Sequence, residues 1–152
     1  MRKLLLSLAV VTLFAGGPVV ASDQTDVMVP IHQFVDGFNK GDTKAALAAC
    51  SDVTSIIDDF PPHEWHGAGA CSTWANDYEA NAKKESIADG VVTLGKPKHV
   101  DVMADHAYVV IPSDYTYTKK GKAMKQTASA FTFALQKGAS GWRITGWSWS
   151  RN

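Results

Sequence analysis

Apolar side chains in the first half of the chain recur at helical spacing. Four of them stand at i, i+3, i+4 and i+7, on one face of a helix: Ile31, Phe34, Val35 and Phe38. Proline is tolerated in the first turn of a helix, so Pro30 marks the start, and Gly41 ends the helix. Asp42 can cap a second, alanine-rich helix over roughly residues 43–50.

A β-branched run over residues 53–57 predicts a short strand that ends at Asp58 and Asp59. Residues 60–69 are expected to be irregular, because adjacent prolines and two glycines interrupt them. A third amphipathic helix is predicted to follow, with its apolar face at Cys71, Trp74, Ala75, Tyr78 and Ala82.

From residue 87 onward the apolar pattern changes from a period of 3.6 to a period of 2, which is typical of strands. Strands are predicted over residues 91–94, 99–103, 106–118, 123–136 and 142–150. Turn residues separate them, so consecutive strands are expected to pair as an antiparallel meander. Helices followed by strands, without alternation, indicate the α+β class.

The last predicted strand carries large apolar side chains of both parities. Trp142 and Ile144 share one side, and Trp147 and Trp149 share the other. A bulge at Gly146 would gather all four on one face. Without a bulge, the sheet has a second aromatic face that needs a cover, and this favours a homodimer through the sheet face.

The N-terminus has the layout of a secretory signal peptide. Arg2 and Lys3 precede an apolar run over residues 4–14, and small residues follow up to Ala21. The run is too short for a membrane span, which needs roughly 20 apolar residues. We expect cleavage after Ala21, a periplasmic or secreted location, and one mature domain over residues 22–152 without a membrane span.

Charge and cysteine content narrow the picture further. Fifteen basic and fifteen acidic residues balance, and the basic ones are scattered, so a nucleic-acid surface is not expected. In an oxidising compartment Cys50 and Cys71 can form a disulfide, which closes a loop of about 20 residues and contributes about 3 kcal/mol. Two buried free thiols are the alternative, and the sequence leaves both open.

The turn Asn39-Lys40-Gly41-Asp42 resembles the turn between the first two helices of NTF2-like proteins, in particular the SnoaL-like branch related to ketosteroid isomerase. The order of predicted elements resembles that group over nearly the whole mature chain. The resemblance implies a conical half-barrel, with three N-terminal helices packed on a strongly curved, mainly antiparallel sheet around a pocket. It does not settle the function.

The resemblance can be carried over to single residues. Asp58 stands at the position of the isomerase's general base. Phe34 stands where the isomerase has a tyrosine donor, and Ser129 stands where it has an aspartic acid, just before Phe131. The missing tyrosine argues against steroid isomerase activity, because that donor stabilises the transition state. A more general acid–base site stays open.

Two clusters could carry such chemistry. Alternation along the strand points one of Asp58 and Asp59 inward, where apolar walls would raise its pKa and let it act as a base. The alternative is a carboxylate bonded to nearby backbone amides. His63 and His66 are expected at the pocket mouth, where an Asp–His pair could move protons. Their spacing is not the helical H-E-x-x-H pattern, and neither a metal nor a cofactor is expected.

Seven side chains are candidates for contact with a small-molecule ligand: Phe34, Trp74, Tyr78, Tyr115, Ser129, Phe131 and Trp147. The aromatic ones could instead fill a core, and Tyr115 could lie on a dimer or solvent face.

Three functions stay open. The first is an exported domain that binds an apolar or aromatic small molecule. The second is an acid–base enzyme of the cyclase, isomerase or dehydratase type, with Asp58 as general base and a histidine or tyrosine within hydrogen-bond reach of it. The third is a dimeric association domain whose interior is filled, with a cavity below roughly 300 Å³.

Overall fold

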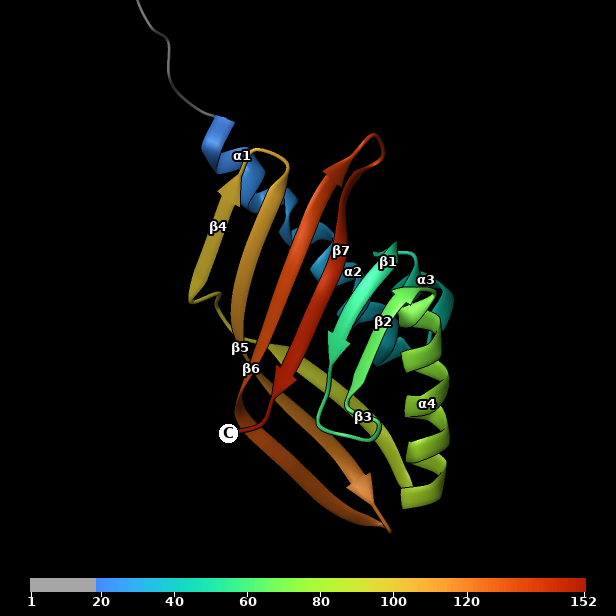
Figure 1. Cartoon of the computed structure of the whole chain (residues 1–152). Coiled ribbons are helices and arrows are strands. Elements are labelled where there is room, and N and C mark those ends of the chain that lie inside the picture. Colours follow the sequence, from blue (N-terminus) through green and yellow to red (C-terminus); the bar gives the residue numbers. More distant parts are fainter. Residues whose placement is uncertain (1–18) are drawn as a thin grey trace, which may run out of the picture.

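The computed structural model of the chain describes residues 19–152 (Figure 1). The predicted signal peptide lies outside the described residues, apart from its last three positions, which begin the unpredicted helix α1 (Val19–Asp26). No helix among residues 19–152 is long and apolar enough to cross a membrane. The α+β class predicted from the order of elements is confirmed.

Three further helices match the three predicted ones: α2 (Met28–Lys40), α3 (Thr43–Leu47) and α4 (Ala70–Glu85). Pro30 lies in the first turn of α2, and Gly41 ends this helix in the left-handed region, with φ at 68°. Asp42 caps α3 by accepting a hydrogen bond of 2.9 Å from the backbone N–H of Ala45. Helix α3 is shorter than predicted, because Cys50 begins a strand.

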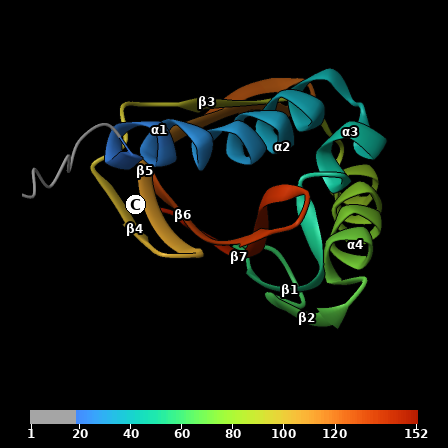
Figure 2. The same ribbon diagram turned by 90° about the horizontal axis from the view of Figure 1, so that it is seen from above.

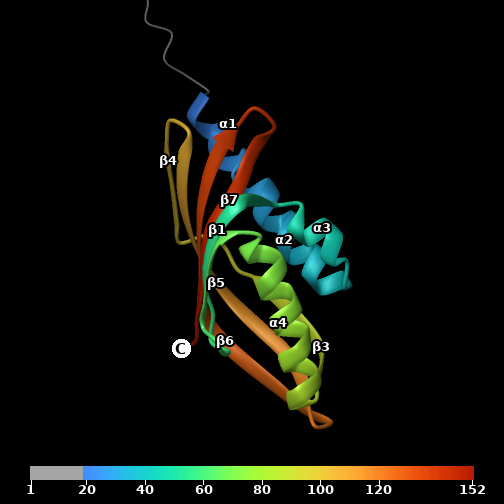
Figure 3. The same cartoon turned by 45° about the vertical axis from the view of Figure 1, so that its right-hand side comes forward.

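Seven strands form one curved sheet: β1 (Cys50–Ile57), β2 (Glu64–Ala68), β3 (Ile87–Leu94), β4 (His99–Met103), β5 (His106–Lys119), β6 (Lys122–Gly138) and β7 (Gly141–Ser150). Their order is β2-β1-β7-β6-β5-β3, and β4 pairs with β5. The β1–β7 pair is parallel and the other pairs are antiparallel. Seen from above, the sheet curves as an open arc, with α2 and α4 on its concave side (Figure 2). A side view shows the same two layers (Figure 3).

Two parts of the sheet correct the predicted meander. Strand β2 lies within residues 60–69, which were expected to be irregular; it is a short edge strand beside β1. Strands β3 and β4 do not pair with each other. Both pair with β5, β4 along residues 106–110 and β3 along residues 113–119, so they lie end to end. Turn residues between two strands indicate a change of direction but not which strand lies alongside.

The last strand contains the bulge that would place its large side chains on one face. The register between β6 and β7 shifts between the pairs Ala134–Gly146 and Leu135–Ile144. All four side chains are buried: Trp142, Ile144, Trp147 and Trp149. Gly146 also allows close approach of β1, because a Cβ there would lie 3.0 Å from the carbonyl oxygen of Ser55. Strand β7 therefore has no second aromatic face, and the homodimer stays a prediction without that support.

The core lies between α2 and the concave face of the sheet. Its largest fully buried apolar side chains are Phe133, Ile31, Ile56, Ile111, Leu135 and Ile144. Burying one such side chain contributes about 1.5–3 kcal/mol. Asn39, from the turn motif, holds the end of α2 to β3: its side chain donates to the oxygen of Val92 and accepts from its nitrogen, both at 2.8 Å.

Cys50 and Cys71 form a disulfide, which is the paired alternative of the two that the sequence left open. The bond joins the first residue of β1 to the first turn of α4, with the Cα atoms 6.6 Å apart. It therefore holds α4 against the sheet at the end from which Trp74 projects.

Candidate functional site

A recess opens on the concave side of the sheet, between α2, α4 and the end of β1. Its wall is mostly aromatic or aliphatic, with two acids: Phe34, Val35, Phe38, Asp58, Asp59, Phe60, Trp74, Tyr78, Val92, Tyr115, Phe131, Trp147 and Trp149. The recess has a cavity volume of about 60 Å³ and an open mouth. This volume lies below the roughly 300 Å³ given above for a filled interior, so the recess is narrow and the association domain stays an open alternative.

Asp58 is the acid inside this recess. It directly follows β1, and its Oδ2 accepts a hydrogen bond of 2.8 Å from the indole Nε1 of Trp74 on α4. Its Oδ1 accepts one of 2.7 Å from the backbone N–H of Asp59. Burial raises the pKa of Asp58 from 3.8 to about 7, although these two hydrogen bonds oppose the rise. Near neutral pH its carboxyl group can therefore both accept and release a proton.

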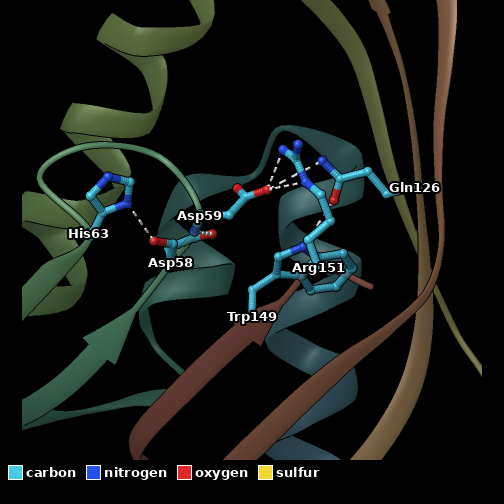
Figure 4. A network of polar contacts seen from close by, with 6 residues as sticks. All are labelled: Asp58, Asp59, His63, Gln126, Trp149 and Arg151. Carbon is cyan, nitrogen blue, oxygen red and sulfur yellow. Dashed lines mark hydrogen bonds and ion pairs between the residues drawn. The ribbon is translucent and has the colours of Figure 1, made fainter.

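Asp59 is held in a different way, by the C-terminal segment (Figure 4). Its Oδ2 accepts hydrogen bonds from Nε and Nη2 of Arg151, at 2.9 and 2.5 Å, and from Nε2 of Gln126 at 3.4 Å. Gln126 in turn accepts a hydrogen bond of 3.1 Å from the Nε1 of Trp149. The two adjacent carboxylates thus have unlike surroundings: Asp58 lies among apolar walls and Asp59 pairs with a guanidinium.

The predicted partnership between Asp58 and a histidine is corrected by the structure. His63 contacts the backbone of Asp58, with its Nδ1 3.1 Å from the carbonyl oxygen, and not the carboxylate (Figure 4). His66 lies on edge strand β2, where it is exposed and pairs with Glu64 at 3.3 Å. Trp65, between Glu64 and His66, is buried, so alternation along β2 turns His66 outward.

Two tyrosines bring their hydroxyl groups together in the recess wall. The hydroxyls of Tyr78 on α4 and Tyr115 on β5 lie 2.6 Å apart. Burial, with the nearby charge of Asp58, raises the pKa of both phenols, so both keep their protons at neutral pH. One phenol donates to the other, and the second phenolic hydrogen is left to donate to a ligand oxygen.

Six of the seven residues predicted to contact a ligand line the recess, and Ser129 does not. Ser129 is fully buried on β6, and its Oγ has no hydrogen-bond partner within residues 19–152. Prediction from sequence missed five apolar wall residues: Val35, Phe38, Phe60, Val92 and Trp149. The helical spacing of Val35 and Phe38 could have identified those two, because they share the face of Phe34.

Residues 27–151 match the family model described as a SnoaL-like domain. The chain belongs to the SnoaL-like family. For this SnoaL-like domain, the NTF2-like fold implied by the turn motif and element order is confirmed.

Solved structures resemble this SnoaL-like domain at low sequence identity. An NTF2-like superfamily protein from Salmonella enterica is 17% identical over 88% of this chain and 93% of its own, with a TM-score of 0.73. An NTF2-like protein with a cystatin-like fold from Novosphingobium aromaticivorans is 15% identical over 87% of this chain and 83% of its own, with a TM-score of 0.69. A ketosteroid isomerase-like protein from Erwinia carotovora atroseptica is 18% identical over 85% of this chain and 95% of its own, with a TM-score of 0.64.

These likenesses show the fold alone. A comparison with curated protein sequences gives no match. Any function of this SnoaL-like domain must therefore be argued from its own recess.

The raised pKa of Asp58 predicts how stability depends on pH. In the unfolded chain Asp58 ionises near 3.8, and in the folded chain near 7. Between these values the unfolded state binds fewer protons than the folded state. The contribution of Asp58 to the free energy of unfolding is therefore full below about pH 4. It falls as pH rises to about 7, by up to about 1.4 kcal/mol per pH unit.

Asp58→Asn removes this fall in stability. Denaturant unfolding across this range measures it, with Asp52→Asn, at an exposed position, as control. Parallel pH profiles for wild type and Asp58→Asn would contradict the burial of an ionisable acid.

Proposed function

We propose that this SnoaL-like domain binds a small, flat, largely apolar molecule in the recess, with one polar group of the ligand facing Asp58. The observation that carries the proposal is the carboxylate of Asp58, which lies inside an aromatic recess and is held there by an indole N–H. Ligand sites typically combine apolar walls with a few polar groups that set orientation.

The polar atoms restrict the ligand further. Each oxygen of Asp58 accepts one hydrogen bond from the protein, which leaves lone pairs for a ligand hydroxyl or N–H. The Tyr78–Tyr115 pair offers one phenolic hydrogen to a ligand oxygen. Aromatic walls suit a ring. A phenol-like molecule meets all three requirements, and the narrow recess favours a single ring.

We expect phenol to bind the wild-type protein and Asp58→Asn to weaken that binding about tenfold at a pH of about 8, where the carboxylate is ionised, because a hydrogen bond to a charged acceptor is lost. Isothermal titration calorimetry measures both dissociation constants. Asp52→Asn is the matched control and should bind like wild type. Equal affinities of wild type and Asp58→Asn would remove Asp58 from the ligand site.

Acid–base catalysis is the second candidate function. The favouring observation is that Asp58 has a pKa of about 7 and occupies the base position implied by the resemblance. Such a group can take a proton from carbon next to a ketone, while a phenolic hydrogen of the tyrosine pair stabilises the oxygen of the enolate. The side chain that donates a hydrogen bond to Asp58 is that of Trp74, neither a histidine nor a tyrosine, so we place this function second.

The enzyme candidate predicts that the protein accelerates deuterium uptake next to the carbonyl of beta-tetralone in deuterium oxide, as followed by proton NMR. Asp58→Asn should return the rate to that of buffer, because the base is gone, and Asp52→Asn should keep the full rate. A wild-type exchange rate equal to that of buffer would overturn the enzyme candidate for this ketone.

We also propose that the protein is exported. The apolar N-terminal run supports this, and so does the disulfide, because disulfides persist in oxidising compartments. Expression of the full chain in a Gram-negative bacterium should yield a periplasmic chain that begins at Ser22. Its intact mass should be about 2 Da below that of the reduced chain. A cytoplasmic chain that retains Met1 to Ala21 would overturn this.

A further inference from the structure

A second cavity lies next to the recess, on the helical side of the molecule. This groove runs between α2, α3, α4 and the first half of β3, and its polar lining includes Lys40, Thr43, Asn76, Glu79 and Asp89. Its cavity volume is about 560 Å³, against about 60 Å³ for the recess. The larger groove therefore lies directly beside the smaller recess.

Three aromatic side chains line both cavities and form the partition between them: Phe38, Trp74 and Tyr78. Trp74 is fixed by its hydrogen bond to Asp58 and is 6% exposed. The hydroxyl of Tyr78 is held by its hydrogen bond to Tyr115. A ligand oxygen can take the place of the Tyr78 hydroxyl, so that Tyr115 keeps a hydrogen-bond partner. Tyr78 is therefore the side chain of the partition that a ligand can displace.

The backbone at Gly90 brings the groove close to the tyrosine hydroxyls. Gly90 lines the groove, and a Cβ on it would lie 2.6 Å from the hydroxyl oxygen of Tyr115 and 3.0 Å from that of Tyr78. The pairing of β3 with β5 shifts register here, and Asp89 has a positive φ of 55°. Bulges of this kind are frequent beside functional sites. The bare backbone of Gly90, which lines the groove, therefore leaves room for the two hydroxyls close behind it.

We infer that the recess and the groove are two halves of one binding site, which a ligand joins by displacing Tyr78 and accepting the hydrogen bond of Tyr115. The inference rests on the proposed function, in which the recess binds a ring. The ligand class follows from the geometry: a hydroxylated ring lies in the recess against Asp58, a carbonyl oxygen accepts from Tyr115, and a second group extends into the groove. Aryl ketones with a para hydroxyl have this arrangement.

Two probes of nearly equal size test the carbonyl contact. Para-hydroxybenzophenone has a carbonyl between its rings, and para-benzylphenol has a methylene there. Wild type should bind the ketone about tenfold more tightly, because one hydrogen bond from the half-buried Tyr115 hydroxyl distinguishes the two probes. Tyr115→Phe keeps the ring and should abolish this preference. Tyr117→Phe is the matched control, two residues further along β5, and should keep the preference. An unchanged ketone preference in Tyr115→Phe overturns the inference.

The partition is tested with phenol as the short probe. Tyr78→Ala removes one of the three side chains that separate the cavities, so it should raise the ratio of ketone affinity to phenol affinity about tenfold. If phenol binds but Tyr78→Ala alters both probes alike, the two-part site is wrong and the proposed function stands. If phenol binds to neither wild type nor variants, the proposed function fails. Should Tyr78→Ala not fold, the Tyr115→Phe comparison decides alone.

Discussion

The site depends on one hydrogen bond, from the indole of Trp74 to the carboxylate of Asp58. It joins the helical layer to the sheet across the recess, since Trp74 projects from α4 and Asp58 directly follows β1. The disulfide holds the start of α4 to the start of β1, so both ends of this contact are positioned by the same pair of elements. Losing the indole donor would leave a buried acid with one fewer partner, at a cost of about 1–3 kcal/mol.

Much of the fold could be predicted because local rules and tertiary packing agree there. The face of α2 that carries Ile31 and Phe34 is apolar at helical spacing, and both side chains are buried. On β7, simple alternation would have put two tryptophans on the outer face, and Gly146 was the one visible sign of a bulge. A glycine inside an aromatic strand is itself a local sign of a bulge, so the bulge could be predicted from the sequence.

The rest could not be predicted because it depends on contacts between distant segments. Nothing local to residues 64–68 indicates that β1 offers an edge on which they can pair. His63 and His66 are close to Asp58 in sequence, but a positive φ at His63 and the alternation of β2 turn them elsewhere. Tyr78 and Tyr115 are 37 residues apart, and their hydroxyls meet only because the tertiary fold brings these parts of α4 and β5 together.

The phenylalanine at position 34 can be understood from the positions of the hydrogen-bond donors in the recess. Phe34 removes the donor that the isomerase resemblance requires on α2, and its ring instead contacts Trp74 and Trp147. Donors reach the recess from the other side, from Trp74 and Tyr78 on α4 and from Tyr115 on β5. Because the indole N–H already holds Asp58 and one phenolic hydrogen already joins the two tyrosines, a ligand finds only the remaining lone pairs of Asp58 and the second phenolic hydrogen free. Such a site selects ligands by the hydrogen bonds they can form with these groups, and an apolar ring alone would leave them unpaired.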